Sequence, residues 1–303
     1  MDFQSVLNKL TLDVAPVVGS GRVASYIPAL AQVSPEQFGV ALSTVAGEAA
    51  QAGAARTKFS IQSLSKVLGL TLALRTMGES LWQHVGREPS GDPFNSLIQL
   101  EHEQGKPRNP FINAGAICVA DHLVSAYPDA KQALLDLVSG LCGEPVQFDA
   151  EVARSERVAG FRNAALCNFM KSFGKIHNDV DQVLDLYFHQ CAIELNCTQL
   201  ARTFGYLANE GVQPISGQVV VTPRQARRIN SLMLTCGTYD AAGEFAFQIG
   251  LPCKSGVGGG IVAIVPKHLA LCVWSPGLDD TGNSVAGRRA LELFSAGTGL
   301  SVF

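Results

Sequence analysis

The hydrophobic periodicity along the chain is the sequence feature that most restricts its possible fold. Strand-like patterns lie near both ends, at 38–47 and within 217–274, and helical patterns begin and end the chain at 3–12 and 284–296. Several helical stretches separated by Gly, Pro and Asn fill the middle, from 110 to 211. We therefore predict an α/β fold of the α+β type, in which an antiparallel sheet is flanked by terminal helices and a helical lobe is inserted.

The two predicted lobes are discontinuous in sequence. Within a single domain of residues 1–303, we assign 1–70 and 215–303 to a sheet-containing lobe and 71–214 to a helical lobe. The individual predictions are helices at 64–78, 112–127, 131–142, 181–194 and 226–237, a strand at 217–223, and a hairpin of 259–266 with 268–276.

Composition restricts the partners and the compartment. Charged residues make up 16% of the chain, below the usual quarter, which predicts extensive burial within the fold or between subunits. The net charge of −3 and the shortness of the basic clusters argue against nucleic acid as a partner. Asp2, Lys9 and Asp13 would interrupt a signal core, and no apolar run approaches the length of a membrane span. We expect a cytoplasmic protein that does not enter the membrane.

The cysteines and histidines do not predict a metal site. The eight cysteines show no CxxC or other metal spacing, and the six histidines form no HExxH pair. We interpret the cysteines as reduced and mostly buried thiols, and we expect no metal and no cofactor.

The first motif with chemical potential is SxxK, from Ser63 to Lys66. On the first turn of a helix these two side chains share a face, so a hydroxyl and an amine can meet. The helix N-terminus adds positive potential, and a lysine kept neutral by desolvation or a nearby cation could accept the hydroxyl proton. Most SxxK sequences are nevertheless ordinary surface residues of helices, so the motif alone is weak evidence.

The second motif is Lys254-Ser255-Gly256, within the strand-like run PCKSGVGGG. It resembles the K-[TS]-G element of penicillin-recognising serine hydrolases, in which the small residues on an edge strand let a substrate approach main-chain donors. The alternative is that the glycines at 258–260 form only a flexible turn. SxxK early and KSG late, around a helical middle, resemble the serine β-lactamase and transpeptidase superfamily, which indicates acyl transfer without identifying a substrate.

Six segments make the resemblance more specific. In order along nearly the whole chain, they are similar to the bacterial and mitochondrial glutaminase family: FSIQSLSKVLGL at 59–70, NPFINAGAI at 109–117, SERVAGFRN at 155–163, LDLYFHQCAIE at 184–194, LTCGTYDAAGEFA at 234–246 and CKSGVGGGIVAIVP at 253–266. The resemblance implies a β-lactamase/transpeptidase-like fold and hydrolysis of L-glutamine to L-glutamate and ammonia without cofactor or metal. It also implies a homodimer or homotetramer.

The resemblance assigns catalytic roles to matching positions. Ser63 would be the nucleophile that forms a glutamyl ester, Lys66 its activating partner, and Tyr239 a second proton carrier. The main-chain N–H groups of Ser63 and Val257 would form the oxyanion hole. Whether Lys66 or Tyr239 takes the first proton stays open.

The resemblance also assigns substrate contacts. Glu156 would face the ammonium of glutamine, and Tyr26 would close over the substrate. The carboxylate and the rest of the head group would be held by Asn113, Asn163 and Tyr187. Taken singly, such residues are more often a helix cap, a solvated charge or a core aromatic. Cys253, next to the KSG motif, raises the minor hypothesis that thiol reagents affect the site.

Two other functions share part of this sequence pattern. A penicillin-recognising hydrolase shares both motifs but works outside the cytoplasmic membrane, and Glu156 with the asparagines suits an amino-acid head group better than an acylated peptide. A non-catalytic amino-acid sensor on the same fold would be expected to lose Ser63 or Lys66, and both are present.

Overall fold

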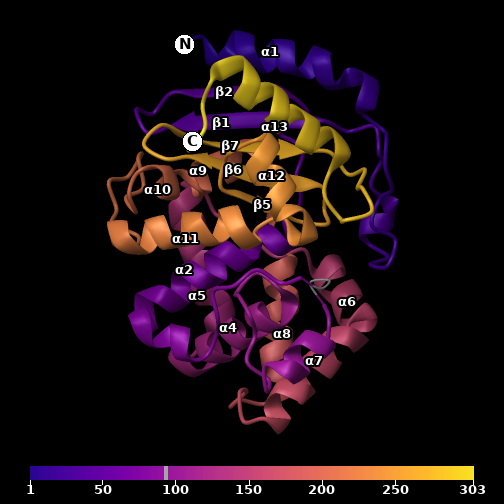
Figure 1. The fold of residues 1–303 in the computed structure, drawn as a ribbon, viewed down its shortest axis with the longest axis vertical. Coiled ribbons are helices and arrows are strands. Elements are labelled where there is room, and N and C mark those ends of the chain that lie inside the picture. The colour runs from indigo at the N-terminus through magenta and orange to yellow at the C-terminus, as the bar shows by residue number, and fades with distance from the viewer. Residues whose placement is uncertain (92–94) are drawn as a thin grey trace.

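A five-stranded antiparallel sheet organises the chain (Figure 1). The computed structural model describes residues 1–91 and 95–303. Neighbouring strands follow the order β2-β1-β7-β6-β5, so strands from the two ends of the sequence share one sheet. Their bounds are Gly39–Thr44 for β1, Ala49–Gly53 for β2, Cys253–Ser255 for β5, Gly260–Val265 for β6 and Leu269–Trp274 for β7.

The central strands are buried on both faces, which explains their continuous apolar sequences GIVAIV and LALCVW. On one face, Val40 and Leu42 of β1 pack with Leu7 of α1 (Phe3–Val14). Ala41, whose side chain points the other way, belongs to the core formed with the middle helices. Helix α13 (Val285–Thr298) lies beside α1 on the first face, so the predicted antiparallel sheet with terminal helices is confirmed (Figure 1).

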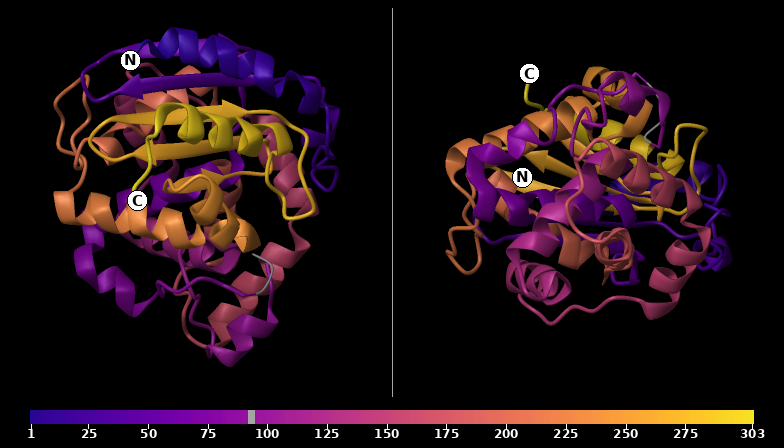
Figure 2. Two further views of the ribbon diagram at one scale, coloured as in Figure 1. Left: turned by 45° about the horizontal axis from the view of Figure 1, so that its top comes forward. Right: turned by 90° about the horizontal axis from the view of Figure 1, so that it is seen from below.

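Helix α2 (Ser65–Met77) connects the sheet to the helical part of the molecule. Its residues from 65 to 74 are all buried, as expected of a helix surrounded by other elements. Seen from below in Figure 2, the helical layer lies in front of the sheet. Its helices are α3 (Ile98–His102), α4 (Asn113–Ala126), α5 (Ala130–Cys142), α6 (Ala150–Ala159), α7 (Phe161–Ser172) and α8 (Val180–Cys191).

The remaining elements lie between the sheet and the helical layer or pack against them. The short strand β3 (Phe59–Ser60), which precedes α2, pairs antiparallel with β4 (Glu194–Leu195), which follows α8. Helices α9 (Cys197–Thr203) and α10 (Gly205–Ala208) pack against the sheet, although they lie within residues 71–214. The division into two lobes stays a prediction. Helices α11 (Pro223–Cys236) and α12 (Ala242–Gln248) lead back to β5.

The predicted β6–β7 hairpin is confirmed, and the predicted strand at 217–223 is wrong. Val219 forms only an isolated bridge with Val212, and its side chain is 68% exposed. The run GQVVVTP lacks a partner strand because its end already caps a helix. Thr222 accepts from the Gln225 amide in a capping box, with Pro223 at the first position of α11.

None of the helices in residues 1–91 and 95–303 is long and apolar enough to cross a membrane. Over the same residues, the His, Cys, Asp and Glu side chains form no group of three that could hold a metal ion. All eight cysteines are free and buried.

Candidate active site

Ser63 lies at the turn between β3 and α2. It belongs to a short 3-10 segment, Gln62–Leu64, and is 8% exposed. Gln62 just before it has a φ of 49°, a left-handed conformation that is rare for a residue with a β-carbon. Such strain often accompanies functional sites, and here it accompanies the sharp turn into the helix.

Lys66 is a buried lysine one turn below Ser63, with 1% of its surface exposed. Its Nζ donates to Asn113 Oδ1 at 2.6 Å and to the Phe111 carbonyl at 3.2 Å. Burial lowers the pKa of Lys66 to about 8, although the nearby carboxyl group of Glu156 opposes the shift. A substantial neutral fraction is therefore available near physiological pH.

Tyr239 is the second titratable group next to the serine. It lies in the 3-10 segment Tyr239–Ala241, also with a left-handed φ, of 56°. Its hydroxyl donates to the Ser255 carbonyl at 3.4 Å. Burial raises the pKa of Tyr239 to about 12, and hydrogen bonding to the Ser63 side chain opposes part of the rise. The phenol therefore stays protonated at neutral pH, in contact with the serine.

Lys254 and Ser255 of the KSG motif lie in the edge strand β5, and Gly256 directly after the strand brings main chain close to Ser63. A β-carbon on Gly256 would lie 2.8 Å from the Ile61 carbonyl oxygen and 3.2 Å from the Ser63 nitrogen. Glycine is required for this approach, which sets the backbone before Val257 against the backbone of Ser63. Two main-chain amides can thus converge on one reacting oxygen.

Cys253 faces away from this site. It is buried in the core on the side of the terminal helices, and burial raises the pKa of its thiol. Strand alternation places its side chain opposite that of Lys254. We therefore expect thiol reagents to leave Cys253 unmodified in the folded protein.

Ser63 opens into a cavity of about 100 Å³ that gathers seven of the eight predicted substrate-binding residues. Tyr239, the eighth, reaches Ser63 from the β5 side. The lining residues are Tyr26, Ile27, Gln62, Ser63, Asn95, Asn113, Glu156, Ala159, Arg162, Asn163, Tyr187, Cys191 and Val257.

The charges and amides of the cavity suit an amino-acid head group. Glu156 is 6% exposed, and burial raises its pKa to about 7 against the opposing effects of a hydrogen bond from Gln62 and the charge of Lys66. Asn113 Nδ2 donates to Asn163 Oδ1 at 3.0 Å, which links helices α4 and α7. An acid and a pair of amides that line the same small cavity can hold an ammonium and a carboxylate.

The two tyrosines of the cavity differ in burial. Tyr187 on α8 is 3% exposed, whereas Tyr26 is 57% exposed and lies at the cavity mouth. Sequence reasoning missed Gln62, Asn95, Arg162 and Cys191 as lining residues. Spacing could have found Cys191, which is four residues after Tyr187 on the same helix face.

The fold and the cavity define a class of protein. A buried SxxK serine and lysine, a tyrosine on the serine hydroxyl and a KSG edge strand on an antiparallel sheet characterise serine acyl-transfer enzymes of the β-lactamase-like fold.

Comparisons with known proteins identify the family within this class. The glutaminase family model matches residues 21–303. A glutaminase of Agrobacterium fabrum is 53% identical over 305 residues, covering 100% of this chain and 99% of the relative. A solved Bacillus glutaminase is 32% identical with a TM-score of 0.91, covering 100% of both chains. A structure titled Mglu in its glutamate form is 33% identical with a TM-score of 0.94, covering 100% of this chain and 70% of that one.

The chain belongs to the glutaminase family. The predicted activity, hydrolysis of L-glutamine to L-glutamate and ammonia, is confirmed by this membership, as is the predicted β-lactamase-like fold. The penicillin-recognising hydrolase and the amino-acid sensor are not favoured.

Proposed function

We propose that the chain hydrolyses L-glutamine through a glutamyl ester on Ser63. The observation that supports this proposal most directly is that Ser63 lines the cavity and has the Tyr239 hydroxyl against its side chain. Ser63 Oγ attacks the side-chain amide carbon, and the resulting oxyanion is held by the main-chain N–H groups of Ser63 and Val257.

Lys66 takes the proton from Ser63 in this scheme. Its pKa of about 8 makes it the neighbouring base with an accessible neutral form, whereas the Tyr239 phenol is neutral and can only donate. Tyr239 then protonates the leaving nitrogen, the C–N bond breaks and ammonia departs. Proton transfer from Lys66 restores the phenol. Water next attacks the ester, its proton returns to Ser63 Oγ as the C–O bond breaks, and L-glutamate leaves.

Glu156 binds the ammonium of the substrate in its ionised form. Asn113, Asn163 and Tyr187 hold the carboxylate and the head group, and Tyr26 covers the cavity mouth. The support is that all five line the same small cavity as Ser63. A neighbour at 33% identity was solved in a glutamate form, which supports binding of the product L-glutamate by this chain.

The assembly and location of the enzyme are further parts of the proposal. Exposed aromatics such as Phe161 (83%) and Phe247 (86%), together with the low charged fraction, support a homodimer or homotetramer. Eight free, buried thiols support a reducing cytoplasm. Light scattering after size exclusion gives the subunit number, and a monomeric mass at micromolar concentration would contradict the assembly.

The function is tested by ammonia and glutamate release from L-glutamine, with L-asparagine as a competing substrate. Wild type and Ser63→Ala are compared after circular dichroism has shown that both fold. Turnover confined to wild type and preferring glutamine supports the proposal. Retained turnover in Ser63→Ala rejects this nucleophile.

A further inference from the structure

The position of the Tyr239 phenol depends on the backbone that carries it. The hydroxyl lies 3.4 Å from the Ser255 carbonyl oxygen, longer than the usual O–H···O hydrogen bond of about 2.7–2.8 Å. The backbone of Tyr239 is itself unfavourable, because a φ of 56° is rare for a residue with a β-carbon. Such a conformation persists only where neighbouring groups hold it. The groups that hold this backbone therefore determine where the proposed proton donor lies.

Asn283, in the loop between β7 and α13, reaches this backbone. The Asn283 side chain is fully buried, and its Nδ2 donates to the carbonyl of Thr238, directly before Tyr239, at 3.2 Å. A β-carbon on Gly282 would lie 3.6 Å from Tyr239 Cε2 and 3.9 Å from Val257 Cγ1. The loop therefore lies beside both the proposed proton donor and the residue that supplies the proposed oxyanion-hole amide.

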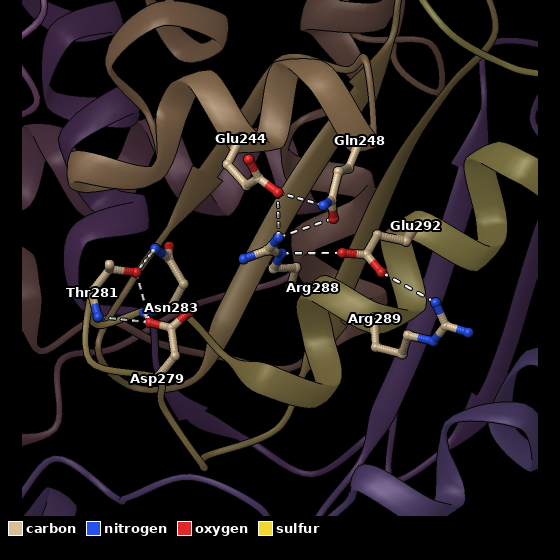
Figure 3. A network of polar contacts seen from close by, with 8 residues as sticks. All are labelled: Glu244, Gln248, Asp279, Thr281, Asn283, Arg288, Arg289 and Glu292. Carbon is tan, nitrogen blue, oxygen red and sulfur yellow. Dashed lines mark hydrogen bonds and ion pairs between the residues drawn. The ribbon is translucent and has the colours of Figure 1, made fainter.

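The loop that carries Asn283 is held by its own polar contacts, which Figure 3 shows. Asp279 Oδ1 accepts from the main-chain amides of Thr281 at 2.9 Å and Asn283 at 3.0 Å, and from the Thr281 hydroxyl at 2.7 Å. The Asp279 amide donates to the Asn283 carbonyl at 2.8 Å. The Asn283 side chain thus extends from a fixed backbone, as a residue that positions another must.

Stability alone does not explain a buried amide at this place. In the part of the chain that the structure describes, Asn283 Oδ1 is buried without a hydrogen-bond partner. An unpaired buried oxygen is destabilising, and an apolar group of the same shape can be neutral or better. Both acceptors of Nδ2 have a second partner: the Thr238 carbonyl also accepts from the Ala241 amide, and the Thr281 hydroxyl donates to Asp279. The amide therefore needs another explanation.

We propose that Asn283 is a positioning residue for the acyl-transfer step, whose amide holds the Thr238 carbonyl and so keeps the Tyr239 hydroxyl against Ser63. The inference rests on the proposed roles of Ser63 and Tyr239. Asn283 is not among the residues that line the cavity in the described chain, so it acts through Tyr239 and not on the substrate. The step that it affects is protonation of the leaving nitrogen, for which the hydroxyl must be within hydrogen-bond reach.

The test is a double-mutant cycle of Asn283→Leu with Tyr239→Phe, measured as kcat and KM for L-glutamine and as the Kd for L-glutamate. Leucine keeps the branching of the side chain and removes the donor. We expect Asn283→Leu to lower kcat at least about tenfold, because a small misplacement of a reacting group is enough to do so. KM and the glutamate Kd should change by less than about threefold, because the residues that bind the head group are untouched.

In the Tyr239→Phe background, Asn283→Leu should lower kcat by less than about threefold. A wild-type kcat in Asn283→Leu, or an equal fold loss in both backgrounds, would overturn the proposal. A wild-type kcat in Tyr239→Phe would overturn it together with the proposed role of Tyr239. Absence of turnover in folded wild type would refute the proposed function, and the inference with it.

Two matched controls separate this contact from the general loss of a buried amide. Asn230→Leu removes a bond of the same type, since Asn230 Nδ2 donates to the Leu207 carbonyl at 3.0 Å and its Oδ1 is likewise buried and unpaired among the described residues. Thr281→Val removes the other acceptor of Asn283 Nδ2 and leaves the contact with Thr238. Both variants should keep kcat within about threefold of wild type.

A kcat loss in either control equal to that of Asn283→Leu would refute the specific role of the contact with Thr238. Circular dichroism establishes that each variant folds before its kinetics are compared. If Asn283→Leu does not fold, Asn283→Ala removes the same donor without adding volume, and the same kcat loss and the same cycle are expected of it. A folded Asn283→Ala with wild-type kcat would overturn the proposal.

Discussion

Glu156→Gln is predicted to make the protein more stable and the enzyme much weaker. Burial raises the pKa of Glu156 from 4.5 to about 7, so the ionised carboxylate is unfavourable in the empty cavity. An acid whose folded pKa is raised lowers stability as the pH rises from 4.5 to 7, and the full penalty applies at pH 8. That penalty amounts to about 3 kcal/mol at most. Glutamine removes the charge and keeps the size.

Glu156→Gln should weaken binding of the substrate although it stabilises the empty protein. In Glu156→Gln, the ammonium of bound glutamine is buried in the cavity without its acid. Breaking a buried charge pair costs about 3–5 kcal/mol, which corresponds to a loss of about 150- to 4000-fold in kcat/KM. The same change removes a negative charge near Lys66, so the pKa of Lys66 falls further.

The assay combines thermal unfolding at pH 8, kcat and KM for L-glutamine, and the Kd for L-glutamate by calorimetry. Glu151→Gln, an exposed acid on the same helix, is the matched control and should leave all three close to wild type. A kcat/KM for Glu156→Gln within threefold of wild type, or a lowered Tm, would refute the assignment of Glu156.

Three further predictions concern the base, the KSG strand and a histidine cluster. The value of kcat/KM should rise with pH through about 8, because Lys66 must lose its proton, and a flat profile between pH 7 and 9 would contradict this role. Gly256→Ala should lower kcat at least about tenfold, because the added methyl forces β5 away from Ser63. The control Gly140→Ala, whose methyl would meet no atom within 3.8 Å, should keep the wild-type kcat. Equal kcat values for the two variants would refute the close approach of Gly256 to Ser63. Burial and the nearby His84 lower the pKa of His122 from 6.5 to about 4, so stability should be lost as the pH falls from 6.5 towards 4. Urea unfolding at pH 7.5 and 5 should show a smaller loss in His122→Gln, and equal losses would contradict the contribution.

Much of the fold could be predicted because its local signals agree with its tertiary structure. The β6–β7 pair is apolar throughout and turns at a single Pro-containing loop, so pattern alone located it. Strand β2 (AAQAG) has no β-branched or aromatic residue, and its place in the sheet depends on pairing with β1 and packing on α1. The run at 217–223 is the opposite case: its sequence favours a strand, but without a partner strand it forms none.

The residues that line the cavity could be named in part from the sequence, but their contacts could not. Spacing placed Lys66 on the helix face of Ser63, yet the hydrogen bonds of Lys66 go to Asn113 and Phe111 on another segment. The left-handed backbone of Gln62 and Tyr239 carries no sequence signal, because neither residue is a glycine. Such features depend on the surrounding fold, which holds them in place.

The proposed reaction depends most on the covalent intermediate at Ser63. Wild type and Ser63→Ala are mixed with L-glutamine, quenched in acid within milliseconds, digested and examined by mass spectrometry. We predict one added glutamyl group on the peptide that contains Ser63 in wild type, and none in Ser63→Ala. A glutamyl group on another residue would contradict the proposed intermediate. So would a wild type that turns over with Ser63 unmodified at every quench time, together with equal turnover by Ser63→Ala.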